Sequence, residues 1–283
     1  MECLVCNNNS FKKFLSKNKF HPEYLKCKKC GFVFAPPQKD FIYRRFNYAP
    51  KKTDETKIRL LNYELRYQLI DKYLNKEKPV FLDVGTNDGI FIKLLKSKNI
   101  QSTGIEPNTD AVNHARNNYG ISLINAKFED YNFTKNYDVI TLFNVFEHVT
   151  NPQEIIEKIK EISSSNALLV LELPNIHYFF PRISFGYWHH FQSTHYWFFN
   201  KKTLRIFLEK HGFQLKSMGY IPKIVTYAKV FNIFMKTFKL YRNVSVKRYL
   251  KFRESNFYRK LNRRKIKIRS RDYLFAIAEK KIN

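Results

Sequence analysis

Long hydrophobic runs are missing from this sequence. No apolar stretch approaches the roughly 18 residues that a membrane-spanning helix needs, and the N-terminus, MECLVCNNNS, has no apolar signal region. Hydrophobic residues nevertheless make up 44% of the 283 residues. That share excludes a disordered chain and allows one core of roughly 150 to 200 residues plus a smaller unit. We therefore expect a folded intracellular protein in a reducing compartment.

Cysteine is scarce and confined to one end of the chain. The four cysteines form two pairs within the first 30 residues, Cys3-x-x-Cys6 and Cys27-x-x-Cys30. Without export, a disulfide framework is not expected, and this spacing fits a tetrahedral zinc site with four thiolate ligands. The alternative is four unrelated small core residues. A site closed by four thiolates is structural, and so small a lobe cannot bury enough surface without its metal.

Acidic residues are also few. The chain has 24 Asp and Glu against 51 Lys and Arg, which gives a net charge of +27. Between Lys223 and Arg271 there are 17 basic residues and one acid, Glu254. Such a segment attracts nucleic acid, anionic lipid or phosphorylated substrates. The alternative is a compositional bias that only solvates a surface.

Strand and helix patterns alternate through the middle of the chain. Apolar strands that alternate with amphipathic helices predict a mostly parallel sheet covered on both faces, which is the doubly wound, Rossmann-like α/β class. We expect seven strands, the last one antiparallel, and a small N-terminal zinc ribbon. The expected strands are 79–85, 101–107, 121–126, 137–144, 167–175, 213–221 and 272–280, and the expected helices are 57–74, 90–99, 110–120, 152–163 and 201–212.

These patterns divide the chain into four parts. They are a zinc ribbon (1–37), a connector with an N-terminal helix (38–78), an α/β core (79–221 and 272–283) and a basic, partly helical insertion (222–271). In the insertion, aromatic residues recur at helical spacing from Tyr227 to Tyr241. That pattern suits a helix lying on an anionic membrane, and it equally suits packing on the core or on a second subunit.

The stretch FLDVGTNDGIF, residues 81 to 91, joins the first expected strand to the next helix. Ligands of doubly wound sheets bind at such turns. The phosphate loop and the dinucleotide loop both fail here, because no Lys-Ser/Thr follows and because Asn87 and Ile90 replace glycines. What remains is an acid followed by Gly85, Asn87 and Gly89 at alternate positions, the pattern of an S-adenosylmethionine loop. Asn87 replaces a glycine because asparagine tolerates left-handed geometry. The alternative is a tight turn that holds no ligand.

Several motifs together resemble class I S-adenosylmethionine-dependent methyltransferases. More narrowly, the sequence is similar to a bacterial family that joins an N-terminal zinc ribbon to the methyltransferase domain and includes deoxysugar C-methyltransferases. The resemblance covers residues 1 to about 220 and the closing strand. It rests on the cysteine pairs and on DVGTNDGIF, GIEPN, FNVFEHVTNP, ELPN and THYWFFNKKTLRIFLEKHGF.

The resemblance implies a set of cofactor-binding residues. Those at the glycine turn line the methionine end of the cofactor, Glu106 binds the ribose, and Phe128 and Glu129 frame the adenine. Glu106, at the end of the second strand, can accept hydrogen bonds from both ribose hydroxyls. The full set is Asp83, Gly85, Thr86, Asn87, Gly89, Glu106, Pro107, Phe128, Glu129 and Asn144.

Four residues are candidates for catalysis. His148 and His195 match histidines of the family and have the right unperturbed pKa for a base, Glu172 ends the fifth strand, and Tyr43 could close over the site. Each also has a plain structural reading as a cap or packing residue. The deoxysugar enzymes have a glutamate where Thr194 stands here. O- or N-methylation is therefore as well supported as C-methylation.

Three functions remain open from the sequence. The first is methylation of a sugar, nucleotide sugar or glycan precursor in the cytoplasm, with possible peripheral contact at the inner membrane face. The second is an RNA methyltransferase or RNA-binding protein, motivated by the charge and the ribbon. The loop NVFEHV lacks the Asn/Asp-Pro-Pro-aromatic motif of base-methylating enzymes, so nucleic acid is not the favoured acceptor. The third is a scaffold that has lost its cofactor. The oligomeric state stays open.

Overall fold

A six-stranded sheet forms the centre of the computed structural model, which describes residues 1–18, 21–36, 53–177, 188–237, 251–269 and 271–281. The strand order is β5-β4-β6-β7-β12-β9. The strands are β4 (Phe81–Val84), β5 (Ser102–Ile105), β6 (Tyr137–Phe143), β7 (Ser163–Pro174), β9 (Phe213–Gly219) and β12 (Tyr273–Lys280). Neighbours from β5 to β7 pair in parallel, whereas β12 is antiparallel to both β7 and β9. The expected mostly parallel sheet with an antiparallel last strand is confirmed.

The expectation of seven strands is wrong by one. Residues 121–126 lie beside β5 but meet it in a single bridge, between Ile105 and Ile124. The flanking hydrogen bonds run from Glu106 N to Ile124 O and from Ile124 N to Gly104 O. The pairing ends there, because Asn125 turns its amide toward the carbonyl oxygens of Glu106 and Pro107. The segment occupies the place of an edge strand without forming one.

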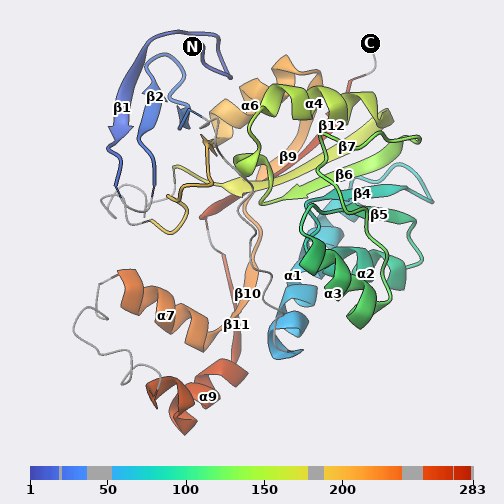
Figure 1. Cartoon of the computed structure of the whole chain (residues 1–283), viewed down its shortest axis with the longest axis vertical. Coiled ribbons are helices and arrows are strands. Elements are labelled where there is room, and N and C mark those ends of the chain that lie inside the picture. Colours follow the sequence, from blue (N-terminus) through green and yellow to red (C-terminus); the bar gives the residue numbers. More distant parts are fainter. Residues whose placement is uncertain (19–20, 37–52, 178–187, 238–250, 270, 282–283) are drawn as a thin grey trace.

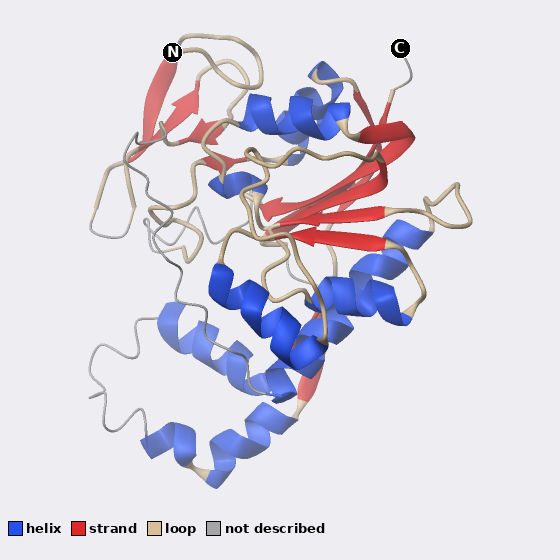
Figure 2. Cartoon of the chain, turned by 45° about the vertical axis from the view of Figure 1, so that its right-hand side comes forward, coloured by secondary structure: helices blue, strands red, loops and turns tan. Residues whose placement is uncertain are grey.

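Helices cover both faces of the sheet (Figures 1 and 2). One face carries α1 (Thr53–Asp71), α2 (Ile90–Ser97) and α3 (Thr109–Tyr119), and the other carries α4 (Pro152–Glu161) and α6 (Lys201–Lys210). Each set has its own core. Phe91, Ile92 and Leu95 of α2 are buried in the first core, and Ile155, Ile156 and Ile159 of α4 are buried in the second. These side chains recur at helical spacing, so the amphipathic pattern of the sequence sets the two layers.

The N-terminal lobe is joined to the core by a shared sheet. Strands β1 (Phe11–Leu15), β2 (Tyr24–Cys27) and β3 (Val33–Phe34) pair in an antiparallel manner, and the fourth strand is β8 (Trp197–Phe198) from the core. The Trp197 ring stacks on Phe32 and Phe34, with centroids 6.3 and 6.1 Å away. Tyr24 meets Phe198 edge to face. The lobe and the α4/α6 side of the core therefore share one hydrophobic cluster.

The basic insertion is a hairpin with helices at its far end. Strands β10 (Lys223–Thr226) and β11 (Lys265–Ile268) pair in an antiparallel manner, and α7 (Tyr227–Thr237) and α9 (Asn256–Arg263) extend away from the core (Figure 1). The side-chain amide of Asn62 in α1 holds the base of the hairpin, because it accepts from Ile224 N at 2.8 Å and donates to Ile224 O at 2.9 Å. In the part of the chain that the structure describes, each helix is too short or too polar to cross a bilayer.

Candidate functional site

The turn between β4 and α2 adopts left-handed backbone at three positions. The φ angles are 66° at Gly85, 55° at Asn87 and 68° at Gly89. The expected left-handed asparagine is thus confirmed. A side chain at Gly85 would collide with that of Val145, which lies directly against the turn. Glycine is therefore needed at residue 85 both for its conformation and for this close approach.

Glu106 lies beside the turn rather than far from it. Its carboxylate accepts a hydrogen bond from Asn87 N at 2.9 Å and another from Asn108 N at 3.0 Å. Burial raises the pKa of Glu106, and these two N–H groups oppose the rise. A carboxylate offers about four lone-pair sites, so Glu106 keeps acceptor capacity for the hydroxyls of a ribose.

Asp83 is buried at the end of β4. It accepts a hydrogen bond from Thr141 Oγ1 at 2.6 Å, and burial raises the pKa of Asp83 to about 6. The side chain of Thr86 is buried beside the same strand end. Asp83 is therefore a carboxylate whose charge is costly without a cationic ligand.

Asp83→Asn should raise the free energy of unfolding of the ligand-free protein at pH 8 by up to about 3 kcal/mol, because a rise in the pKa of Asp83 from 3.8 to about 6 is a change of about two pKa units. A raised folded-state pKa favours folding below the unfolded value and loses that contribution as the pH rises through about 6. Most of the gain should therefore vanish at pH 4. Urea unfolding at both pH values measures it.

The matched ligands for this variant are S-adenosylmethionine, a cation, and S-adenosylhomocysteine, its uncharged thioether. The same Asp83→Asn change should weaken binding of the cation more than binding of the thioether. An equal loss for both ligands, or a stability gain that does not depend on pH, would contradict the assignment of Asp83.

Two ion pairs tie α1 to the site, and sequence reasoning missed both. Arg59 Nη2 donates to Asp88 Oδ1 in the turn at 2.6 Å. Arg66 binds both oxygens of Glu172, with Nε–Oε2 at 2.6 Å and Nη2–Oε1 at 2.7 Å. Burial opposes ionisation of Glu172, but Arg66 and Lys223 hold its pKa below the usual value. These contacts support a structural role for Glu172, which was predicted as catalytic.

The other cofactor candidates lie at neighbouring loops. Phe128 is buried against Phe133, with ring centroids 5.4 Å apart. The carbonyl of Glu129 accepts from Lys158 Nζ at 2.6 Å. Asn144 follows β6 with φ 58°, and among the described residues its buried Oδ1 has no hydrogen-bond partner. This orphaned oxygen, the spare lone pairs of Glu106 and the left-handed turn fit an adenosyl ligand.

The two predicted histidines do come together. His148 ends a short 3-10 helix, η1 (Phe146–His148), after β6, and His195 lies in the loop before β8. Their ring centroids are 4.4 Å apart. His148 Nδ1 donates to Thr194 O at 2.8 Å, and the Gln192 amide lies 2.5 Å from His195 Nε2. Burial lowers the pKa of both histidines, so both are neutral at physiological pH.

Further polar residues surround this pair. The ring of His190 lies 5.8 Å from His195 and 4.6 Å from Tyr273 by centroid distance. Lys223 Nζ lies 3.2 Å from the centre of the Tyr273 ring. Glu147 is fully buried, and burial raises its pKa to about 8. Sequence reasoning missed Glu147, although its position next to His148 could have pointed to it. The fourth candidate, Tyr43, lies outside the described residues.

The four cysteine sulfurs lie within 4.8 Å of one another. The Cys3–Cys30 and Cys6–Cys27 sulfur distances are 3.5 and 3.6 Å. Ligands about 2.3 Å from a tetrahedral zinc ion are about 3.8 Å apart, so the cluster fits zinc. Both pairs also form the same knuckle: Gly31 N donates to Cys27 O at 3.0 Å and Asn7 N donates to Cys3 O at 2.9 Å.

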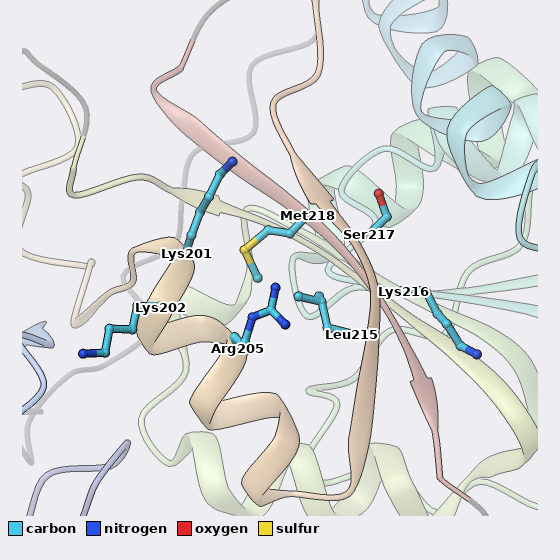
Figure 3. A pocket seen from close by; sticks show the side chains of 7 residues that line it. All are labelled: Lys201, Lys202, Arg205, Leu215, Lys216, Ser217 and Met218. Carbon is cyan, nitrogen blue, oxygen red and sulfur yellow. The ribbon is translucent and has the colours of Figure 1, made fainter.

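A basic groove lies at the β9 edge of the central sheet (Figure 3). It has a volume of about 390 Å³ between α6 and the edge strand β9. Its lining residues are Lys201, Lys202, Arg205, Leu215, Lys216, Ser217 and Met218. Lys216 is paired with Glu279. Since β9 is four strands from β4 in the sheet order, this groove is separate from the glycine turn.

Comparison with known proteins agrees with the geometry. A methyltransferase-domain family matches residues 56–217. A ubiquinone biosynthesis O-methyltransferase from Glaesserella parasuis is 30% identical over 105 residues, which are 33% of this chain and 44% of that protein. The chain thus spans less than half the length of this curated relative.

Comparison with solved structures also finds methyltransferases. A chain in the complex of the Haloferax volcanii Trm112 methyltransferase activator with a methyltransferase has a TM-score of 0.53 at 12% identity, over 81% of this chain and 94% of that one. The plantazolicin methyltransferase BpumL with S-adenosylhomocysteine has a TM-score of 0.47 at 17% identity, over 81% and 85% of the two chains.

Proposed function

Because the chain belongs to the methyltransferase-domain family, we propose that it transfers a methyl group from S-adenosylmethionine to a small acceptor: a sugar, a nucleotide sugar or a glycan precursor. The proposal rests most directly on one observation. The half-buried His148 and the buried His195 lie at the carboxyl end of the parallel strands, with rings 4.4 Å apart, where substrates of such folds bind.

The cofactor half of the proposal is supported by the β4–α2 turn. Gly85, Asn87 and Gly89 expose the backbone there, and Glu106 is fixed beside them by two backbone N–H groups. S-adenosylmethionine supplies its methyl group as part of a sulfonium ion. Asp83 offers the negative charge that favours such a cation, and Asn144 Oδ1 provides a buried acceptor without a partner among the described residues.

The acceptor half is supported by the histidine pair. Methyl transfer is an in-line attack, and the enzyme mainly supplies alignment. A hydroxyl nucleophile must also lose its proton, and the neutral imidazoles of His148 and His195 have lone pairs that can promote this loss. We favour oxygen over carbon and nitrogen, because the curated relative is an O-methyltransferase and Thr194 stands where the C-methylating enzymes have a glutamate.

The charge of the basic insertion indicates which partners the chain could bind. The insertion is basic, with Lys265 and Lys267 exposed along β11, and it suits the diphosphate of a nucleotide sugar or a lipid-linked precursor. Tyr227, Val230 and Phe257 are large exposed hydrophobic residues on the same insertion. They support peripheral contact with an anionic membrane, a proposal that sedimentation with anionic and zwitterionic vesicles would test.

Turnover with a panel of acceptors tests the proposal. We expect release of S-adenosylhomocysteine with nucleotide sugars and not with tRNA or DNA. His195→Asn should lower kcat about 100- to 10,000-fold. His114→Asn, on the outer helix α3, should keep kcat unchanged as the matched control. Turnover that requires a polynucleotide would instead establish the RNA methyltransferase alternative, which the net charge of +27 motivates.

A further inference from the structure

Three potential metal ligands converge beside the proposed acceptor position. They are Glu147, His148 and His195, and one ligand atom from each lies within 4.8 Å of the others. Glu147 and His148 are neighbours on η1, at the carboxyl end of β6, and His195 comes from the loop before β8. Two segments almost 50 residues apart thus bring a carboxylate and two imidazoles to one point.

The backbone fixes these segments against each other. Tyr196 N donates to the carbonyl oxygen of Glu147 at 2.8 Å, and the His148 ring donates to Thr194 O at 2.8 Å. Tyr24 of the N-terminal lobe adds a third link, because its hydroxyl lies 3.2 Å from His195 O. Ligands held by such surrounding hydrogen bonds are already oriented before a metal ion binds.

The carboxylate of Glu147 is buried and lacks part of its hydrogen bonding. Glu147 is 1% exposed, and among the described residues its Oε2 has no hydrogen-bond partner. The nearby cations Arg66 and Lys223 are paired with Glu172 instead. A buried, unpaired polar atom is rare and costly. A cation at this point would satisfy Oε2 and stabilise the ionised form of the carboxylate.

Both imidazoles can direct a lone pair to the same place. The proton of His148 is on Nδ1, which donates to Thr194 O, so Nε2 keeps its lone pair. His195 Nδ1 is buried and makes no aligned hydrogen bond within the described chain, although the backbone of His190 interacts with this ring. The Gln192 amide can turn its oxygen toward Nε2–H of His195, which leaves the lone pair on Nδ1.

We propose that Glu147 Oε2, His148 Nε2 and His195 Nδ1 bind one divalent transition metal ion. Two imidazoles and one carboxylate suit Mn²⁺, Fe²⁺, Co²⁺ or Zn²⁺ better than the all-oxygen ions Mg²⁺ and Ca²⁺. Three protein ligands leave positions open, unlike the closed four-cysteine cluster. This site is chemically and spatially distinct from the ribbon.

The inference rests on the proposed function where it assigns the ion a role. An acceptor hydroxyl in an open position would lose its proton to water more readily, because a bound cation lowers the pKa of its oxygen ligands. The hydroxyl oxygen then forms its bond to the methyl carbon while the carbon–sulfur bond breaks and leaves its electron pair on sulfur. With the ion bound, His148 and His195 would promote the loss of the hydroxyl proton through the ion, in place of the direct action that the proposed function gives to their lone pairs.

Titration of the zinc-loaded full chain with Mn²⁺, followed by electron paramagnetic resonance, tests the site. The loading uses one equivalent of Zn²⁺, which the four thiolates bind in preference to the carboxylate and the imidazoles, so that the proposed site stays open to Mn²⁺. We expect one Mn²⁺ per chain, and at least about 100-fold weaker binding in Glu147→Gln and in His195→Asn. Thermal unfolding of both variants shows whether each is folded. If one is not, the other still tests the site.

His189→Asn is the matched control, because His189, His190 and Asp272 form a neighbouring group of possible ligands. This variant should bind Mn²⁺ as the wild type does. Absence of a Mn²⁺ site in the wild type, or a site lost in His189→Asn and kept in Glu147→Gln, would overturn the proposal. Turnover that is unchanged without the ion refutes only its role, and Mn²⁺ binding without turnover on any acceptor refutes only the proposed function.

Discussion

Gly85→Ala is expected to weaken the binding of S-adenosylhomocysteine by about 100-fold or more, because two costs of about 1–3 kcal/mol each combine at this residue. The backbone is left-handed, with φ 66°, and an added Cβ would collide with Val145. Relief of either strain moves the turn whose amides face the ligand. Isothermal titration calorimetry of the variant and the wild type measures the loss.

Gly120→Ala separates the two costs. Gly120 ends α3 with nearly the same φ, 64°, but a Cβ there would meet no atom within 4 Å. The control should therefore lose about 1 kcal/mol of stability and keep its affinity for the ligand. If Gly85→Ala bound the ligand as the wild type does, the turn would not be the cofactor site.

Loss of zinc from the N-terminal cluster should destabilise the α/β core as well as the ribbon. Structural zinc contributes about 10–16 kcal/mol of apparent binding free energy in small zinc domains. Here the ribbon also pairs through β3 with β8 of the core. Cys27→Ser, or treatment with a chelator, should therefore lower Tm and expose Trp197, which stacks on Phe32 and Phe34.

Tryptophan fluorescence reports this change well, because the chain has two tryptophans and Trp188 packs against Phe198 of the shared strand. Readdition of Zn²⁺ should restore the signal of the chelated wild type but not that of Cys27→Ser. Atomic absorption of the purified protein gives the zinc content. A chelator-treated protein with unchanged Tm and fluorescence would show that the cysteines are ordinary core residues.

The local features of the fold could be read from the sequence. Alternating apolar segments located all six strands of the central sheet, the expected helix 110–120 agrees with α3 to within one residue at each end, and Asn87 has the left-handed backbone that its place in the turn implied. Each depends on residues close together in the chain. The prediction of a seventh strand was wrong because an edge strand forms only where it can pair with its neighbour. Asn125 donates to the carbonyl oxygens of Glu106 and Pro107, and the pairing with β5 ends after one bridge.

Contacts between residues far apart in the sequence could not be predicted in the same way. Arg66 and Glu172 are 106 residues apart, and no periodicity connects a helix face with the end of a distant strand. Strand β8 was missed for a related reason. Two residues, Trp197 and Phe198, are too short for a strand pattern and become a strand only beside β3.

The site shows the same limit. His148 and His195 were found as single residues matching a family, and only the fold shows that their rings meet. Glu147 carried a weaker signal, since an acid beside a histidine is common on protein surfaces. Its importance comes from being buried without a partner for Oε2 within the described chain, which depends on everything packed around it.

A crystal structure of the full chain with S-adenosylhomocysteine would show whether the turn at Gly85 and Glu106 form the cofactor site. We expect the nucleoside to lie between the turn at Gly85 and the carboxylate of Glu106, with both ribose hydroxyls within hydrogen-bond distance of that carboxylate. The sulfur should point toward His148 and His195. A ligand bound elsewhere, with Glu106 still bonded only to Asn87 and Asn108, would contradict this expectation.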